Sequence, residues 1–248
     1  QFKSDGSRVY VDVGNHPEIS TAEDVSFLDA TYRVLAGHIR MSSYLSEGLR
    51  RLGSDPFIHK VKKLELIANT CSNDNSSWAN HSNLLTRRDI NPKSYYGVLA
   101  SHNASRIVWS GAGFVHNDPN SIHHEYWISE KAHHIFDVVS GNTTDNRPLV
   151  NTRDETLADP VLYRRLHDIT GETVFSPRVN ALRLAATSII LRACELGENF
   201  SDLELLSPVR AIRQISYDPS LKTHVSLADG RFYRGVDVQR AIAERAMG

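Results

Sequence analysis

The stretch of sequence that decides the fold is Arg8-Val9-Tyr10-Val11-Asp12-Val13-Gly14-Asn15-His16-Pro17-Glu18-Ile19-Ser20-Thr21-Ala22-Glu23. Its first part alternates, with valine at positions 9, 11 and 13 and Tyr10 and Asp12 between them. A period of two predicts a β-strand that buries the valines and presents Tyr10 and Asp12 on its other face. Aspartate is disfavoured within a strand and costly to bury without a partner. Asp12 is therefore expected either to be a solvated surface acid or to face a cation or a metal.

A turn follows this strand and carries two further acids. Gly14-Asn15 ends the strand, and His16-Pro17 keeps the chain extended as far as Glu18. Ser20-Thr21-Ala22-Glu23 has the spacing of a capping box ahead of a helix. A capping role for Glu23 and a solvated surface position for Glu18 are the structural alternatives to a role in a site.

The composition is that of an ordinary globular protein. The 248 residues include 28 Lys and Arg against 29 Asp and Glu, which gives a formal net charge of -1. This balance indicates neither a nucleic-acid nor a membrane partner, so any phosphate-binding site is expected to be local. The sequence has no apolar run near the length of about 18 residues that a membrane helix needs, and no signal-type N-terminus, which favours a cytoplasmic protein. The two cysteines, Cys71 and Cys194, are too few for a disulfide scaffold or a cysteine zinc site.

Helices are predicted where apolar residues recur at three- and four-residue steps or where helix caps can be recognised. They are residues 25–51, 93–109, 126–139, 179–196, 208–215 and 236–247. Strands are predicted at residues 60–67 and 163–169, with a hairpin around Ala228-Asp229-Gly230. Residues 69–83 form a polar, turn-forming run in which amide side chains flank His81.

Histidines concentrate in the segment from residue 116 to residue 134. They are His116, His123, His124, His133 and His134. Zinc ligands on one helix face are about four residues apart, whereas adjacent histidines point their side chains apart. The segment is therefore interpreted as loop and surface histidines rather than as a metal site.

Arginines gather in two later segments. Arg147-Pro148-Leu149-Val150-Asn151-Thr152-Arg153-Asp154-Glu155 is followed by Tyr163-Arg164-Arg165-Leu166-His167-Asp168-Ile169. If the second segment is a strand, Arg165 and His167 share one face. A solvated charged patch is one interpretation of the two segments. A phosphate site is the other, because planar guanidinium groups donate paired hydrogen bonds to phosphate oxygens.

A strand with carboxylates, a loop containing His81 and arginine-rich strands together resemble the active-site sheet of the glutamine synthetase superfamily. Within it, the chain is more closely similar to the ligase and depupylase family of the prokaryotic ubiquitin-like protein, Pup. The resemblance covers nearly the whole chain. It rests on residues 4–8, residues 10–23, Gly111-Ala112-Gly113, residues 147–155, residues 163–167 and Pro208-Val209-Arg210-Ala211-Ile212-Arg213.

The resemblance implies an α+β fold, with a glutamine synthetase-like antiparallel sheet that forms a cradle backed by helices. It implies one catalytic domain over residues 1–248, with Asp12 as the catalytic residue. The implied ligands of Mg²⁺ or Mn²⁺ are Glu18, Glu23 and His81, and the implied phosphate- or nucleotide-binding residues are Arg147, Arg153, Arg165 and His167. The implied partners are ATP or ADP, a phosphorylated small molecule or protein, and a Pup-like protein.

The chain also departs from the family pattern. The family's first strand, with its G-x-E-T-E metal ligands, and its C-terminal small domain are not in the sequence, so part of the fold is expected to lie upstream of Gln1. In the ligase, the loop reads K-N-N-T-D...G-N-S-Y-G-C-H-E-N-Y. Residues 68–84 lack its lysine, its aspartate, two of its glycines and a glutamate. The altered loop favours a changed acceptor.

Three functions are compatible with this pattern. The preferred one is a magnesium-dependent phosphoryl-transfer enzyme that has become a hydrolase of the phosphatase type, because hydrolysis needs only the metal, the phosphate site and Asp12. The first alternative is a Pup ligase or depupylase that uses ATP. The second alternative is an inactive homologue that binds nucleotide. The retention of so many charged site residues argues against this alternative.

Overall fold

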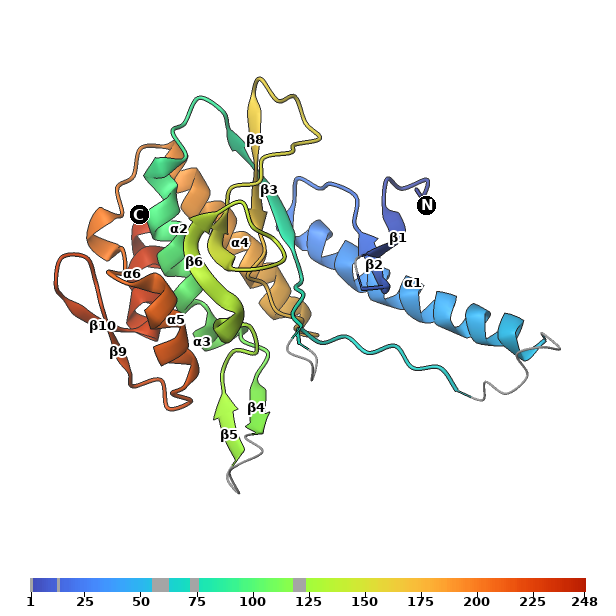
Figure 1. The fold of residues 1–248 in the computed structure, drawn as a ribbon. Helices are drawn as coiled ribbons and strands as arrows, with labels where there is room; N and C mark the ends of the chain where they lie inside the picture. The colour runs from blue at the N-terminus through green and yellow to red at the C-terminus, as the bar shows by residue number, and fades with distance from the viewer. Residues whose placement is uncertain (1, 13, 55–62, 72–75, 118–123) are drawn as a thin grey trace. The chain divides into compact units, whose positions relative to one another are not determined.

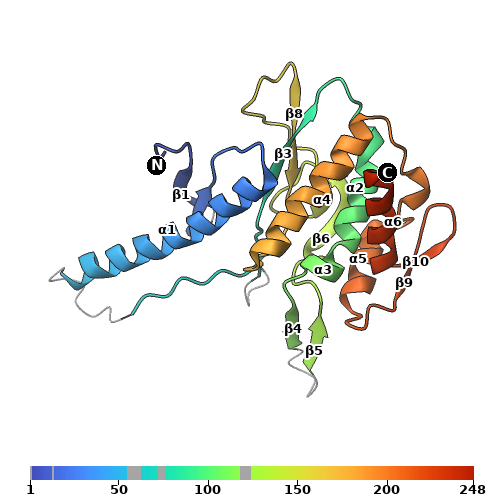
Figure 2. The same cartoon turned by 180° about the vertical axis from the view of Figure 1, so that it is seen from behind.

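The computed structural model describes residues 2–12, 14–54, 63–71, 76–117 and 124–248, and it contains two compact units. Unit 1 comprises Gln1–Ala68 and Ser176–Ala181, and unit 2 comprises Asn69–Phe175 and Leu182–Gly248. Figures 1 and 2 show the elements of the units from opposite sides. The single domain expected over residues 1–248 stays a prediction.

The first element of unit 1 is a β-hairpin. Strand β1 (Arg8–Asp12) pairs antiparallel with β2 (His16–Ser20). In the turn between them, Gly14 has a φ of 82° and Asn15 a φ of 62°. Glycine and asparagine reach this left-handed region at low cost, so the sequence of the turn matches its shape.

The second element of unit 1 is the long helix α1 (Phe27–Gly53). Gly37 is buried on it, and a Cβ at this position would lie 3.2 Å from Cγ2 of Ile19 in β2. The absence of a side chain at Gly37 therefore lets the hairpin lie close to the helix. Arg40 also holds the segment before β1, donating to Ser7 Oγ at 2.7 Å and to Asp5 Oδ2 at 3.0 Å.

Two expectations for unit 1 are wrong. Val11 is 68% exposed rather than buried, and Asp12 is the last residue of β1 rather than a mid-strand residue. Val13 lies outside the described residues. The helix is not capped by the predicted box that ends at Glu23. Its N-cap is Ser26, whose Oγ accepts a hydrogen bond from the Asp29 backbone N–H at 3.4 Å.

Unit 2 is built from a four-stranded sheet, two hairpins and helices. The sheet has the order β3 (Ser82–Arg87), β8 (Tyr163–Asp168), β7 (Arg147–Asn151) and β6 (Ile135–Ser140). The hairpins are β4 (Phe114–Asn117) with β5 (His124–Trp127) and β9 (His224–Ser226) with β10 (Phe232–Arg234). The helices are α2 (Lys93–Ser105), α3 (Ile107–Ser110), α4 (Pro177–Glu195, in unit 2 from Leu182), α5 (Pro208–Ser216) and α6 (Gly235–Met247), with short 3-10 turns at Ala132–His134 and Ser201–Leu203.

Helix α2 forms the centre of unit 2. Val98, Leu99, Ala100 and Ala104 on this helix are fully buried among apolar side chains of the sheet and of α4, α5 and α6. Figures 1 and 2 show α2 enclosed between β6 and the three later helices. All residues from 98 to 105 are buried, including the polar Ser101, His102, Asn103 and Ser105, so this helix is enclosed nearly all round.

The arginine-rich strand β8 lies between β3 and β7 in the four-stranded sheet. β8 pairs antiparallel with β3 and with β7, as expected, whereas β6 runs parallel to β7, which differs from the expected antiparallel sheet. His167 lies opposite Asn83 and Asn151, and Arg165 lies opposite Leu85. Because β8 is a regular strand here, Arg165 and His167 share one face of the sheet.

The other predicted elements have mixed outcomes. The helices of the C-terminal half, the strand near residues 163–169 and the hairpin around residues 228–230 are confirmed within two residues at each end. Residues 60–62 lie outside the described residues, and residues 63–67 form no strand. The helix predicted over residues 126–139 is wrong, because β5, a 3-10 turn and β6 occupy it. The β-branched run in β6 favours a strand over the weak helical period.

A buried ion pair joins the end of α2 to the end of β8. Arg106 Nη2 donates to Asp168 Oδ1 at 3.1 Å and Oδ2 at 2.8 Å, and to Thr170 Oγ1 at 2.7 Å. Arg106 is 1% and Asp168 4% exposed. Burial alone would raise the pKa of the Asp168 carboxyl, but the positive charges of Arg106 and Arg183 and the hydrogen bonds from Thr170 outweigh burial and hold this pKa well below its ordinary value.

Within the described ranges, none of the helices combines the length and the apolar character that a membrane crossing requires.

Asp168→Asn is expected to lower the free energy of unfolding by about 3–5 kcal/mol at pH 7, because it leaves Arg106 buried without a counter-charge. The stabilisation that depends on the carboxylate is fully present above its unfolded pKa of about 3.9 and is lost as the pH falls toward the lower folded pKa. The difference in urea-unfolding free energy should therefore shrink below about pH 4. The matched control Asp89→Asn breaks an exposed ion pair and should cost less than about 1 kcal/mol. Equal losses in both variants at pH 7 would contradict the prediction.

Candidate functional site

The hairpin of unit 1 presents a group of acids on one face. The register places Tyr10 opposite Glu18 and Asp12 opposite His16. Tyr10 Oη donates a hydrogen bond to Glu18 Oε1, and Ser20 Oγ donates to Tyr10 Oη at 3.3 Å. The Arg8 guanidinium lies 4.5 Å from the centre of the Tyr10 ring. The predicted site residues Asp12 and Glu18 are therefore neighbours on this face.

The electrostatics of this face favour a bound cation. Partial burial raises the pKa of the Glu18 carboxyl, the hydrogen bond from Tyr10 opposes that rise, and the negative charge of Asp12 adds to it. Burial and the hydrogen bond to Glu18 raise the pKa of Tyr10 to about 12. Tyr10 consequently stays protonated at neutral pH and remains a hydrogen-bond donor, while Asp12 and Glu18 repel each other unless a cation lies between them.

These residues fit part of a magnesium site. Mg²⁺ is commonly held by one or two carboxylates, water and substrate phosphates, and Asp12 and Glu18 supply two carboxylates. Glu23 is exposed and belongs to unit 1, whereas His81 belongs to unit 2, so the predicted set of Glu18, Glu23 and His81 stays a prediction. Across the described residues, no three His, Cys, Asp or Glu side chains are grouped as metal ligands.

The predicted phosphate-binding residues of unit 2 lie in a group of neighbouring basic side chains, which we call the basic cluster. It consists of His81, Lys131, Arg147, Arg153, Arg165 and His167. The His81 and His167 rings meet edge to face with centroids 4.9 Å apart. Glu155 accepts a hydrogen bond from Arg153 Nε at 3.0 Å and lies 3.6 Å from Arg165 Nη2. The structure therefore brings Arg153, Arg165 and His167 to the same part of the sheet.

Three polar atoms of the basic cluster are shielded from water and have no hydrogen-bond partner among the described residues. They are Arg147 Nη1, Arg165 Nε and His167 Nδ1. A buried polar atom without a partner costs about 1–3 kcal/mol. A bound anion would relieve that cost at the two arginines.

Burial and neighbouring positive charges lower the pKa values of the basic cluster, so its histidines are held mostly neutral. Burial and then the charge of Arg165 lower the pKa of His167 to about 4. Burial also lowers the pKa of Arg147 and of Arg165. His81 is open to solvent on one side, yet desolvation by its surroundings, followed by the charges of Lys131 and His167, lowers its pKa as well. Such a site favours negatively charged ligands, because an anion would compensate the repulsion between the cations.

The sequence did not indicate two buried charged residues of this region, Lys131 of the basic cluster and Glu172. Lys131 is 1% exposed, and its Nζ donates to the Trp78 carbonyl at 3.1 Å. Glu172 is buried and accepts hydrogen bonds from the Ala112 backbone N–H at 2.8 Å and from Glu130 N–H at 3.2 Å. Lysine and glutamate are normally surface residues, so neither composition nor periodicity could have indicated their burial.

The histidine-rich segment has a packing role that the surface interpretation missed. His116 stacks on Trp127 with ring centroids 4.2 Å apart, and His133 lies 4.1 Å from the same ring. Tyr217 completes the group at 5.1 Å from Trp127. His123 lies outside the described residues. His116 and His133 are therefore partly buried members of an aromatic cluster.

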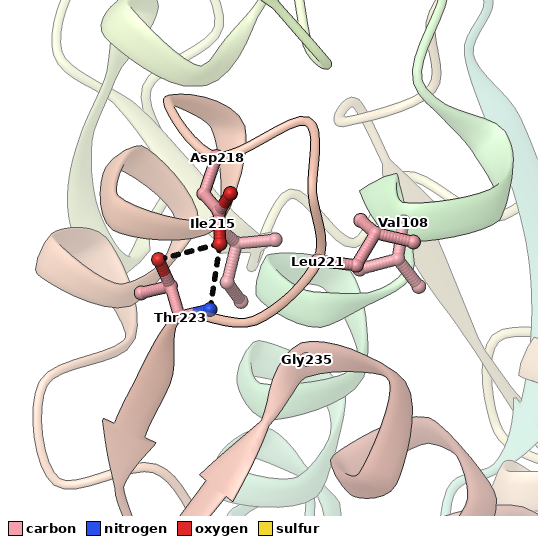
Figure 3. Close-up of a pocket in the computed structure, with 6 residues that line it drawn as sticks. All are labelled: Val108, Ile215, Asp218, Leu221, Thr223 and Gly235. Atoms are coloured by element: carbon pink, nitrogen blue, oxygen red, sulfur yellow. Dashed lines mark hydrogen bonds between the residues drawn. The ribbon is translucent and has the colours of Figure 1, made fainter.

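Two hollows of unit 2 lie away from the predicted site residues. One, beside the Asp218 turn, is shown in Figure 3, where the Asp218 carboxylate accepts hydrogen bonds from Thr223. It leaves no room for a water molecule. The other is an open groove of about 640 Å³ between β6 and α5 and includes Phe136, Arg213 and Tyr217 in its lining. Neither hollow contains a residue of the basic cluster.

Comparison with known proteins gives a consistent result. The family described as Pup-ligase protein matches residues 1–248. The Pup--protein ligase of Renibacterium salmoninarum is 35% identical over 246 residues, 98% of this chain and 52% of that protein. The Pup--protein ligase of Xylanimonas cellulosilytica is 38% identical over 240 residues, 96% of this chain and 51% of that protein. The chain thus spans about half the length of the curated relatives it matches.

Solved structures agree with this result. The Pup ligase PafA in complex with ADP superimposes with a TM-score of 0.87 at 30% identity, covering 100% of this chain and 53% of that one. The complex between Pup and its ligase PafA gives a TM-score of 0.82 at 30% identity, covering 100% of this chain and 49% of that one. The α+β fold class is confirmed. The preference for a phosphatase-like hydrolase is not supported, because these relatives are named ligases.

Asp12→Asn is expected to lower the pKa of Glu18, because it removes a negative charge that disfavours ionisation of Glu18. Tyr10→Phe should have the opposite effect, because the hydrogen bond from Tyr10 stabilises the Glu18 carboxylate. NMR titration of the Glu18 side-chain carboxyl carbon measures both shifts. Asp29→Asn, on the exposed first turn of α1, is the control and should leave the titration unchanged. A Glu18 pKa that is the same in Asp12→Asn would show that the two acids are not neighbours.

Arg165→Ala is expected to weaken binding of pyrophosphate by about tenfold or more, the effect of losing one hydrogen bond from a charged donor. Arg165→Lys should lose less, because it keeps the charge but not the planar pair of donors. Isothermal titration calorimetry measures both variants against Arg192→Ala, an arginine near the end of α4 that is outside the basic cluster. Equal affinities for wild type and Arg165→Ala would exclude Arg165 from anion binding.

Proposed function

Because the chain belongs to the Pup-ligase family, we propose that it is the catalytic part of an ATP-dependent ligase that joins a carboxylate of a Pup-type protein to an amine of a target protein. The single observation that carries the proposal is the family match over the whole chain. The basic cluster and the acids of the β1–β2 hairpin support it, because ligation needs both a phosphate site and acids near the reacting groups.

The chemistry divides into two steps. In the first, a carboxylate oxygen of the Pup-type substrate attacks the γ-phosphorus of ATP, the bond to the bridging oxygen breaks, and ADP leaves, forming an acyl phosphate. In the second, an amine nitrogen attacks the acyl carbon and phosphate leaves, which forms the amide. Catalysis of phosphoryl transfer consists mostly of positioning and charge stabilisation.

The basic cluster is assigned to the phosphates in this proposal. Arg147, Arg153 and Arg165 would hold the phosphate oxygens, and the polar atoms of Arg147 and Arg165 that lack partners give this assignment a physical basis. The neighbouring His167 is held largely uncharged at neutral pH by burial and by Arg165, so it would act as a hydrogen-bonding group rather than as a second full charge.

The acids of unit 1 are assigned to the metal and to the amine. Glu18, with Asp12 beside it, would hold magnesium, which neutralises phosphate charge when bound. A lysine ammonium must lose a proton before its nitrogen can attack, and Asp12 would take that proton. Tyr10 orients Glu18 through its hydrogen bond, and its raised pKa keeps it a donor throughout.

The full-length protein is expected to form a conjugate when it is incubated with ATP, magnesium, a Pup-type peptide ending in glutamate and a lysine-bearing acceptor. Mass spectrometry should find the summed mass of peptide and acceptor less one water. Asp12→Asn should reduce the rate by about 10²-fold or more, the effect of losing a general base. The matched control Asp29→Asn should retain the rate.

Phosphate release without a conjugate, abolished by Asp12→Asn, would overturn the ligase proposal in favour of hydrolysis. A conjugate formed at the wild-type rate by Asp12→Asn would leave the ligase assignment standing and remove Asp12 from it.

A further inference from the structure

Two adjacent residues between β5 and β6 hold the polar segment that leads to His81. Glu130 Oε2 accepts from the Thr70 backbone N–H at 3.0 Å, and Glu130 Oε1 accepts from Cys71 N–H at 3.1 Å. Lys131 Nζ donates to the Trp78 carbonyl at 3.1 Å. We call Glu130 and Lys131 the clamp. It fixes one part of the segment near Thr70 and a second part near Trp78.

Further hydrogen bonds hold the end of this segment that precedes His81. Arg147 Nη2 donates to the Ser77 carbonyl, so Lys131 and Arg147 hold consecutive carbonyl groups. The Asn80 backbone N–H donates to the Gly171 carbonyl at 3.1 Å. With these positions fixed, His81 follows directly and meets His167 edge to face. Lys131, Arg147 and the Gly171 carbonyl therefore hold the residues directly before His81.

A buried lysine is an unusual donor for the Trp78 carbonyl, and packing alone does not explain it. Lys131 is almost fully buried, and burial of an ammonium group is costly, so an apolar side chain of similar size would stabilise the fold at least as well. Burial and then the charge of Arg147 lower the pKa of the Lys131 ammonium to about 7, while the carboxylates of Glu172 and Asp168 oppose that shift. An anion bound beside the basic cluster would raise this pKa and so favour the charged form of Lys131.

We propose that Lys131 is a positioning residue of the phosphate site: through the Trp78 carbonyl it holds His81 against His167, and its charge adds to the attraction of the basic cluster for a nucleotide's phosphates. This inference rests on the proposed function only in naming a nucleotide as the anion. Lys131 acts through the segment of residues 76–81 and through its electrostatic field.

The test compares Lys131→Met, Lys131→Gln and Lys131→Arg in the full-length protein. Lys131→Met removes the donor and the charge, Lys131→Gln keeps a donor without the charge, and Lys131→Arg keeps both. Lys131→Met should bind ADP about tenfold more weakly, the effect of losing one charged interaction. Amide hydrogen exchange in a peptide covering residues 76–81 should become faster, and the melting temperature should stay within a few degrees of wild type.

Lys131→Arg should restore the slow exchange and most of the ADP affinity, and Lys131→Gln should restore the slow exchange but not the affinity. The control Lys93→Met removes an exposed lysine at the start of α2 and should change neither readout. A purely structural role would lower the melting temperature and leave the ADP affinity of the folded protein unchanged. That outcome, or wild-type affinity in Lys131→Gln, would overturn the proposal.

If Lys131→Met fails to fold, Lys131→Gln decides the question, because it keeps the donor that Trp78 needs. If neither variant folds, the role is structural and the proposal fails. Neither readout requires ligation, so the proposed function can fail, with no conjugate formed, while the positioning role of Lys131 stands.

Discussion

The buried pair of Arg106 and Asp168 is the interaction on which the rest of unit 2 depends. Arg106 ends the central helix α2, and Asp168 ends β8, directly after His167. Two charges can be buried so deeply only when each satisfies the other, so the pair allows one arrangement of the helix against the strand. Because β8 is fixed at this end, the positions of Arg165 and His167 follow from the same constraint.

The region around this pair is held by polar contacts rather than by apolar packing alone. The Glu172 carboxylate accepts hydrogen bonds from the backbone N–H groups of Ala112 and Glu130, and Arg183 Nη1 donates to the Glu172 carbonyl at 3.3 Å. Hydrogen bonds are directional, whereas apolar contacts are not. These residues therefore restrict the positions of the loops more than an apolar core would. A phosphate site gains from this, because its donors must be in place before the charge of the transition state develops.

The two units contribute opposite charges to the proposed chemistry. Unit 1 carries Asp12 and Glu18, whose mutual repulsion prepares them for a cation, and unit 2 carries the basic cluster, whose unpaired donors prepare it for an anion. Each group is electrostatically unfavourable by itself. A bound cation would compensate the acids of unit 1, and a bound anion would compensate the basic cluster of unit 2.

The sequence by itself determined the family, the α+β class, most helices and the shared face of Arg165 and His167, because these depend on motifs and short-range periodicity. It misjudged Val11, the start of α1 and residues 126–139, where burial and capping depend on what covers each element. Only the tertiary structure revealed the pairing of Arg106 with Asp168, which are 62 residues apart, and of Lys131 with Trp78, which are 53 apart. A local pattern carries no information about such contacts, because they form only when the chain brings distant segments together and removes water from between them.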